Sequence, residues 1–205
     1  MTIGESSDNN AVELDGIRFE TLVPERELTI PNIKGLKNSV QFGIRITNNS
    51  SISYRFICFH LSPELKRADG ELIERSYARN ATKTPTESDF LLLLPQENLT
   101  FFINAKFCWR GFQLGLTGYD GSGGVWTLCN LKPGIYSVRF TYENHSQTGK
   151  IDGGMTPWKF LEPLWTGVVS TPYEEFRVTD LTVVNGAKIS SKKFQNRATA
   201  IQLNH

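Results

Sequence analysis

The chain has 205 residues, of which 39% are apolar and 21% are charged, and its formal net charge at pH 7 is +1. That length fits one domain and is enough to bury a core without a disulfide or a metal ion. The near-zero charge argues against a dedicated nucleic-acid binder, and no window approaches the about 20 consecutive apolar residues of a membrane-spanning helix.

The cysteines and the first ten residues indicate the compartment. Cys58, Cys108 and Cys129 are odd in number, which favours reduced thiols over a disulfide framework. The start, MTIGESSDNN, lacks the positive charge and the apolar stretch of a signal peptide. We therefore expect a cytoplasmic protein without a signal peptide or transmembrane segment, and we interpret the Asn-x-Ser/Thr triplets as turns rather than glycan sites.

The expected elements begin after a flexible acidic segment, residues 1–13. Short strands are expected over residues 17–22 and 28–30, with Pro24 interrupting them at a sheet edge. The clearest strand covers residues 40–47, because its apolar side chains alternate with polar or small ones. Those apolar positions are Val40, Phe42, Ile44 and Ile46.

The next segments are less regular. Residues 52–61 are apolar or aromatic on both faces, which predicts a central strand paired with residues 40–47. Ser62-Pro63 suits the start of one helical turn over residues 62–65. A short edge strand is expected over residues 71–75, and the leucine run at residues 90–94 predicts a buried strand because it is too short for a helix.

The second half of the chain repeats the alternating pattern. Further strands are expected over residues 99–106, 112–116, 125–128 and 136–142, with a glycine-rich turn at residues 119–124. A long loop follows over residues 143–164. The last strand is expected to begin at Trp165, to be divided by Pro172 and to end at Val178.

These segments predict an all-β fold, an antiparallel sandwich of about 8–10 strands with little or no helix. The sandwich domain is expected to cover residues 14–180, and residues 181–205 form a basic extension. Residues 1–30 hold seven acidic side chains against two arginines, whereas residues 181–205 hold four basic ones and no acid. Two solvated tails explain this asymmetry, and the alternative is that a tail binds a partner or the other tail.

Residues 131–140, LKPGIYSVRF, resemble the corner before the penultimate strand of immunoglobulin-like and fibronectin type III-like domains. Residues 165–172, WTGVVSTP, are similar to the final strand of uncharacterised bacterial domains of this kind, as are the segments RNAT, SDF and LPQE. The resemblance covers about residues 14–178, and it departs from the usual turn at Gln96, where glycine is common. It implies that the antiparallel sandwich is immunoglobulin-like and that Tyr136 bonds backward across the corner, and it implies no activity.

Candidate catalytic and metal-binding groups do not form a recognisable site in the sequence. A Cys₃His zinc site from His60 and the three cysteines lacks a Cys-x₂-Cys pair, so buried thiols are the simpler interpretation. The spacing of Cys129, His145 and Met155 is wrong for a copper loop. No nucleophile elbow or catalytic triad is evident. We therefore expect no catalytic residues, no metal and no cofactor.

Candidate partner-binding residues lie in the long loop, in the glycine-rich turn and in the basic extension. The turn lacks the lysine and the following helix of a phosphate cradle, so a hairpin turn explains it better. Trp109, Tyr119 and Trp126 are either a stacking platform or core, and we favour core. Long loops often bind something. The candidate residues are His145, Met155, Trp158, Tyr119, Lys192, Lys193 and Arg197.

The sequence thus predicts a non-catalytic intracellular module that binds a protein partner or takes part in assembly, with no nucleic-acid or membrane partner. One alternative is an intracellular proteinase inhibitor that acts through an exposed loop, for which residues 143–164 are the candidate. A second alternative is a carbohydrate-binding module that uses exposed tryptophans.

Overall fold

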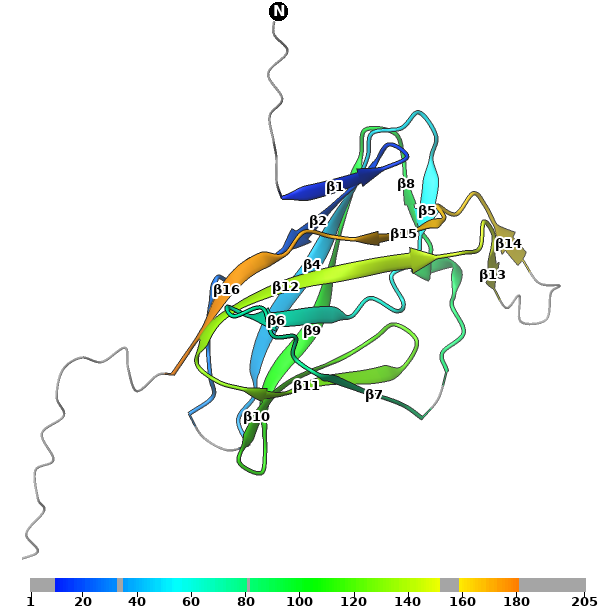
Figure 1. Cartoon of the computed structure of the whole chain (residues 1–205). Helices are drawn as coiled ribbons and strands as arrows, with labels where there is room; N and C mark the ends of the chain where they lie inside the picture. Colours follow the sequence, from blue (N-terminus) through cyan, green and yellow to red (C-terminus); the bar gives the residue numbers. More distant parts are fainter. Residues whose placement is uncertain (1–9, 33–34, 81, 152–158, 181–205) are drawn as a thin grey trace, which may run out of the picture.

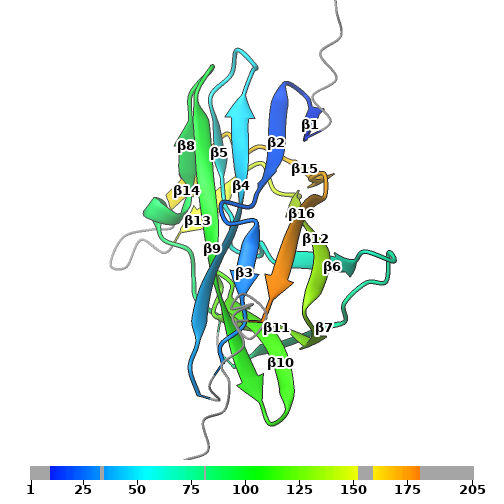
Figure 2. The same cartoon turned by 90° about the vertical axis from the view of Figure 1, so that its left-hand side faces the viewer.

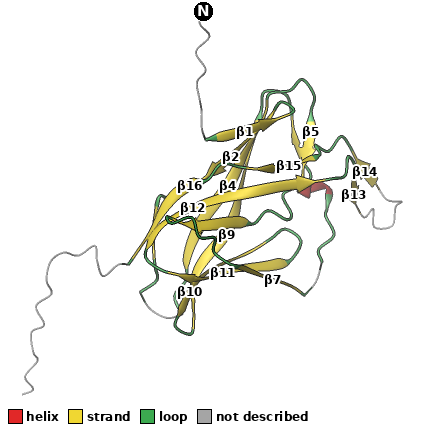
Figure 3. Ribbon diagram, viewed as in Figure 1, coloured by secondary structure: helices red, strands yellow, loops and turns green. Residues whose placement is uncertain are grey.

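The computed structural model describes residues 10–32, 35–80, 82–151 and 159–180. This part of the chain is all-β: it has sixteen strands and one turn of 3₁₀ helix, η1 (Glu87–Asp89). Figure 1 shows how the strands are arranged, and Figure 3 shows the helical turn in red among them. No helix among the described residues is long and apolar enough to cross a membrane.

The larger sheet has seven strands in the order β1-β2-β4-β9-β10-β11-β7. Every neighbouring pair in it is antiparallel. Its strands are β1 (Ala11–Leu14), β2 (Ile17–Leu22), β4 (Asn38–Asn48), β7 (Arg75–Arg79), β9 (Asn98–Arg110), β10 (Gln113–Tyr119) and β11 (Gly124–Leu131).

The five-stranded sheet is built around β12. On one side β12 pairs with β15 and β16, on the other side it pairs with β6, and β3 runs parallel to β16. Two further pairs of three-residue strands complete the fold, β5 with β8 and β13 with β14. The bounds are β3 (Glu27–Thr29), β5 (Tyr54–Phe56), β6 (Pro63–Arg67), β8 (Leu91–Leu93), β12 (Gly134–Asn144), β13 (Gly149–Ile151), β14 (Lys159–Leu161), β15 (Gly167–Ser170) and β16 (Glu174–Thr179).

The two larger sheets face each other (Figure 2). Aromatic side chains from both sheets pack together in the core between them. The ring of Phe42 on β4 lies 4.9 Å from that of Phe176 on β16, and the ring of Phe19 lies 5.8 Å from that of Tyr142. The predicted alternation is confirmed on both strands that it identified most clearly. Their buried residues are Val40, Phe42, Ile44 and Ile46 on β4 and Tyr136, Val138, Phe140 and Tyr142 on β12.

The backward bond expected of Tyr136 is present. The Tyr136 hydroxyl accepts a hydrogen bond from the Lys132 N–H at 3.0 Å and donates one to the Lys132 carbonyl at 2.9 Å. Because the ring is buried while its hydroxyl reaches the preceding turn, the side chain fixes the corner from which β12 starts.

The division of the last strand is also present. β15 pairs with the end of β12 and β16 with its beginning, and residues 171–173 between them break the ladder. The Thr171 hydroxyl lies in this break, where it accepts a hydrogen bond from the Phe140 N–H at 3.0 Å and lies 2.6 Å from the Thr21 hydroxyl. The break is therefore internally hydrogen-bonded rather than open.

Two predictions for residues 52–65 are wrong. In place of the central strand expected over residues 52–61 the structure has only the three-residue strand β5. After Phe56 the chain stops pairing and packs on the core as a loop. The helical turn expected at residues 62–65 is instead β6, whose Leu65 is buried against the core beside Val138 of β12. Side-chain burial and ladder pairing outweigh the local helix-start signal here.

Several boundaries also differ from the prediction. β1 begins at Ala11, inside the segment that was expected to be flexible, because it pairs along β2. The edge strand expected at residues 71–75 begins at Arg75, where pairing with β11 starts. The leucine run is only partly buried, since the alternation of β8 leaves Leu92 48% exposed. The strand number exceeds 8–10 because many of the strands have only three residues.

The tyrosine at the corner yields a stability prediction. We expect Tyr136→Phe to lower the free energy of unfolding by about 1–2 kcal/mol, because it removes two hydrogen bonds and keeps the ring. Urea denaturation followed by tryptophan fluorescence measures this loss. The matched control is Tyr119→Phe, whose ring is 67% exposed, and equal stability of the two variants would contradict the role of the corner.

Candidate functional site

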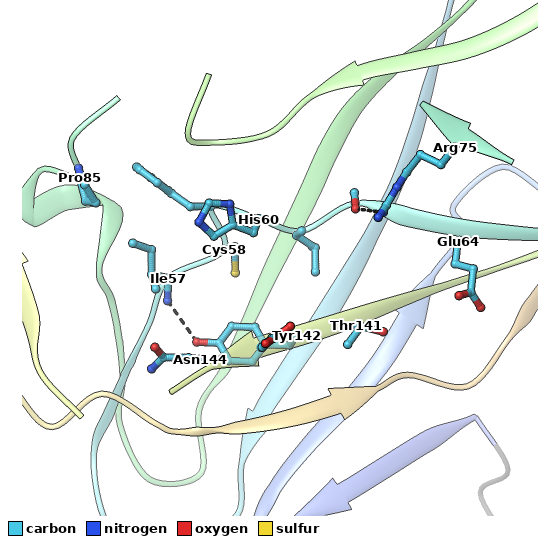
Figure 4. Close-up of a pocket in the computed structure, with 13 residues that line it drawn as sticks. Ile57, Cys58, His60, Glu64, Arg75, Pro85, Thr141, Tyr142 and Asn144 are labelled. Carbon is cyan, nitrogen blue, oxygen red and sulfur yellow. Dashed lines mark hydrogen bonds between the residues drawn. The ribbon is translucent and has the colours of Figure 1, made fainter. Parts of the chain in front are cut away.

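A polar pocket of about 390 Å³ lies where β12 ends, between that strand and the loop that precedes β6. Figure 4 shows Thr141, Tyr142 and Asn144 of β12 along one side and Cys58 and His60 along the other. Arg75 and Glu64 lie at the end of the pocket that is nearest to β6. The pocket therefore follows the direction of β12 and has charged groups at the β6 end.

Cys58 and His60 differ in exposure although they are only two residues apart. Cys58 is buried, and burial raises the pKa of its thiol to about 12, so it stays protonated and is a poor nucleophile at neutral pH. His60 is exposed at the rim, where a buried position in a central strand was expected. That expectation was wrong because residues 57–62 form a loop.

Glu64 is the centre of a charged network at the β6 end of the pocket. Its Oε1 accepts hydrogen bonds from Arg139 Nε at 2.6 Å and from the Tyr173 hydroxyl. Partial burial acts to raise the pKa of Glu64, but the bonds from Tyr173 and Arg139 outweigh it and lower that pKa overall. Lys66 Nζ and the Arg139 guanidinium both lie against the Tyr173 ring, 3.8 and 4.6 Å from its centroid. The negative charge of Glu64 is therefore already compensated within the sheet.

The long loop expected over residues 143–164 contains a small hairpin, β13–β14, which extends beyond the end of β12 (Figure 1). Its base packs on a separate apolar cluster of Phe90, Ile151, Leu161 and Leu164. Gly149 of β13 lies so close to Phe90 that an added Cβ would come within 2.4 Å of the ring.

Polar contacts add to this anchoring. Lys159 of β14 donates to the Glu87 carboxylate at 2.6 Å, and the Leu164 N–H donates to the Gln147 carbonyl at 2.9 Å. The outward side of β14 carries Phe160, which is 61% exposed. The hairpin thus combines a fixed base with an exposed aromatic side chain.

Two of the predicted partner-binding residues, His145 and Tyr119, lie in the part of the chain that the structure describes, and they belong to different regions of the fold. His145 is exposed next to the pocket, with Nε2 2.7 Å from Glu143 Oε1. Tyr119 is exposed at the end of β10, in the other sheet. The other five lie outside the described residues: Met155, Trp158, Lys192, Lys193 and Arg197.

The glycine-rich turn is a hairpin turn held by Asp120. Asp120 Oδ1 accepts hydrogen bonds from the N–H groups of Ser122 and Gly124, at 2.9 and 2.7 Å, and Oδ2 accepts one from the Tyr77 hydroxyl at 2.6 Å. The carboxylate of Asp120 thus accepts hydrogen bonds from neighbouring groups of the chain, as in a turn with a structural role.

The preference for core is confirmed for Trp126, which is fully buried, and is wrong for Tyr119, which is 67% exposed. Trp109 of β9 is half-buried and pairs with Leu114 near the start of β10, whereas Tyr119 ends β10, so the three side chains do not form one platform. Among the described residues no group of three or more His, Cys, Asp or Glu side chains is placed to hold a metal ion.

The sequence analysis missed Ser62, Arg75, Thr141 and Glu143 as pocket residues. The one available signal was Pro63, the residue of β6 at which the pairing with β12 ends; a proline restricts the backbone of the residue before it. Comparison with known proteins adds no assignment, because no family model, curated protein or solved structure matches the chain.

The burial of Cys58 predicts how the thiols react. We expect Ellman's reagent at pH 8 to modify the half-buried Cys108 and Cys129 before Cys58, and to modify all three thiols after denaturation. Modification of Cys58 should therefore form a slow phase, and Cys58→Ser should remove this phase only. Fast modification of three thiols in the folded protein would contradict the buried position.

The lowered pKa of Glu64 predicts a contribution to acid stability. A carboxyl whose pKa is lower in the folded than in the unfolded chain stabilises the fold above its ordinary pKa, 4.5 here. That stabilisation is lost as the pH falls through the folded pKa. We expect Glu64→Gln to flatten the fall of the free energy of unfolding below about pH 4.5, measured by urea denaturation at several pH values. Tyr173→Phe should act in the same direction, and unchanged profiles in both variants would refute the coupling.

Proposed function

We propose that this chain is a non-catalytic protein-binding module that contacts its partner through the β13–β14 hairpin. The observation that carries the proposal is the combination of a fixed base with an exposed aromatic residue. The cluster around Phe90 holds the base at Gly149 and Leu161, and the ion pair Lys159–Glu87 holds the other end of β14, so little conformational entropy is lost when the hairpin binds. Phe160 offers the large apolar side chain on which binding sites rely.

We further infer that the two facing sheets form an immunoglobulin-like sandwich. The hydrogen-bonded corner at Tyr136, the divided last strand and the parallel pairing of β3 with β16 support this inference. The order of the larger sheet departs from the usual arrangement, because β10, β11 and β7 extend it beyond β9. A cytoplasmic location remains a prediction from the sequence.

A proteinase inhibitor is the second candidate, because an anchored, projecting hairpin is also what an inhibitory loop requires. Dose-dependent inhibition in a panel of serine, cysteine and metalloproteinases would favour it. The carbohydrate-binding alternative has less support, since Trp126 and Trp165 are buried and Trp109 donates its indole N–H to the Pro31 carbonyl at 2.8 Å.

The hairpin proposal makes a direct prediction for Phe160. Once a partner has been identified by affinity capture, we expect Phe160→Ser to weaken its binding about tenfold or more without changing the thermal stability of the chain. Isothermal titration calorimetry measures the affinity. Leu72→Ser is the control, because Leu72 is similarly exposed but lies in the turn after β6. Equal binding by Phe160→Ser and the native chain would refute the hairpin as the contact.

A further inference from the structure

The pocket in Figure 4 opens at a place where a strand pairing stops early. β6 pairs with β12 from Arg67 opposite Tyr136 as far as Pro63 opposite Phe140. β12 continues to Asn144, but the chain before Pro63 leaves the sheet. In the described part of the chain, no strand lies beside Tyr142–Asn144 on the β6 side, and the pocket occupies that position.

The backbone of β12 determines which of its polar groups face the pocket. The N–H and C=O of Phe140 both bond Thr171, on the β15 side. Backbone groups alternate sides along a strand, so the C=O of Thr141 and the N–H and C=O of Glu143 point toward the β6 side. Both residues are exposed. These groups are the acceptor and donor that an added strand uses.

The charges at the β6 end of the pocket indicate what kind of group would bind there. Glu64 is held by hydrogen bonds from Arg139 and Tyr173, and Arg75 adds a weaker charge attraction to it. The Arg75 guanidinium donates to the Ser62 hydroxyl, a neutral acceptor, at the mouth of the pocket. A strand added in line with β6 would run antiparallel to β12 and would end at Ser62 and Arg75. Its last group would therefore meet a cation, which favours a carboxylate.

We propose that an extended peptide of a protein partner binds in this pocket as a strand on β12, antiparallel to it and with a carboxylate at Arg75. The inference rests on the proposed protein-binding role and adds a second contact beside the hairpin, whose β13 begins five residues after β12 ends. The inner wall contains Cys58 and Leu61, both buried, so an apolar side chain next to the carboxylate fits the pocket. The carboxylate belongs either to a chain end or to an acidic side chain.

The test uses the full chain and a random display library of peptides with free C-termini. Enriched peptides are synthesised with a fluorophore, and their affinity is measured by fluorescence anisotropy. Glu143→Pro removes the N–H that faces the pocket and should lower the affinity about fivefold or more, whereas Glu143→Ala keeps that N–H and should leave the affinity nearly unchanged. Arg75→Gln should lower the affinity about tenfold or more, with Arg79→Gln on the same strand as its control.

Two peptide modifications complete the test. Loss of binding after amidation of the C-terminus assigns the carboxylate to a chain end, and loss after an Asp-to-Asn change assigns it to a side chain. Methylation of the peptide amide that donates to Thr141 should abolish binding, which tests the strand pairing even if Glu143→Pro fails to fold. No enriched peptide, or binding that is insensitive to Arg75→Gln and to backbone methylation, would overturn the proposal. That failure leaves the hairpin untouched, since Phe160→Ser tests it separately.

Discussion

The five-stranded sheet depends on β12. Its inward side chains are buried between the sheets, and its two edges hold β6 on one side and β15 and β16 on the other. The corner at Tyr136 fixes where this strand starts. Three other strands take their register from β12, and a shift of β12 by one residue would turn its own core side chains, Tyr136, Val138, Phe140 and Tyr142, to the outer face.

Two interruptions along β12 are resolved in different ways. On the β15 side the ladder breaks at Thr171, and its hydroxyl and backbone satisfy the polar groups of Phe140. On the β6 side the ladder stops at the Pro63–Phe140 pair, and the chain before Pro63 turns away from β12. The first break is therefore closed by the protein itself. The second leaves a polar pocket along a strand edge, where a partner's backbone can complete the sheet.

The sequence predicted the parts of the fold that depend on local alternation. In residues 40–47 and 136–142 every second side chain is buried, which fixes both the strand and its inward face without knowledge of its neighbours. The segment 52–61 lacks this alternation of apolar and polar side chains. It is apolar on both sides, and a loop packed on the core buries Phe56, Cys58 and Leu61 as well as a central strand would. Composition alone does not separate these two outcomes.

The candidate site was predicted less completely, for a physical reason. The hairpin lies within a loop that was singled out for its length, but its anchoring depends on contacts between residues far apart in sequence, such as Lys159 with Glu87. The pocket depends on where one ladder ends relative to another, and only Pro63 marks this in the sequence.

The positions of the two sites support a single role. Both the hairpin and the pocket lie at the end of β12, where side chains of the two larger sheets already fill the core. The hairpin is held by its own small cluster and an ion pair rather than by the main core, so changes at Phe160 can alter binding at little cost to the fold. The strand edge at Glu143 supplies directional backbone bonds, and the hairpin supplies apolar area. A partner that uses both would gain orientation from the first and affinity from the second.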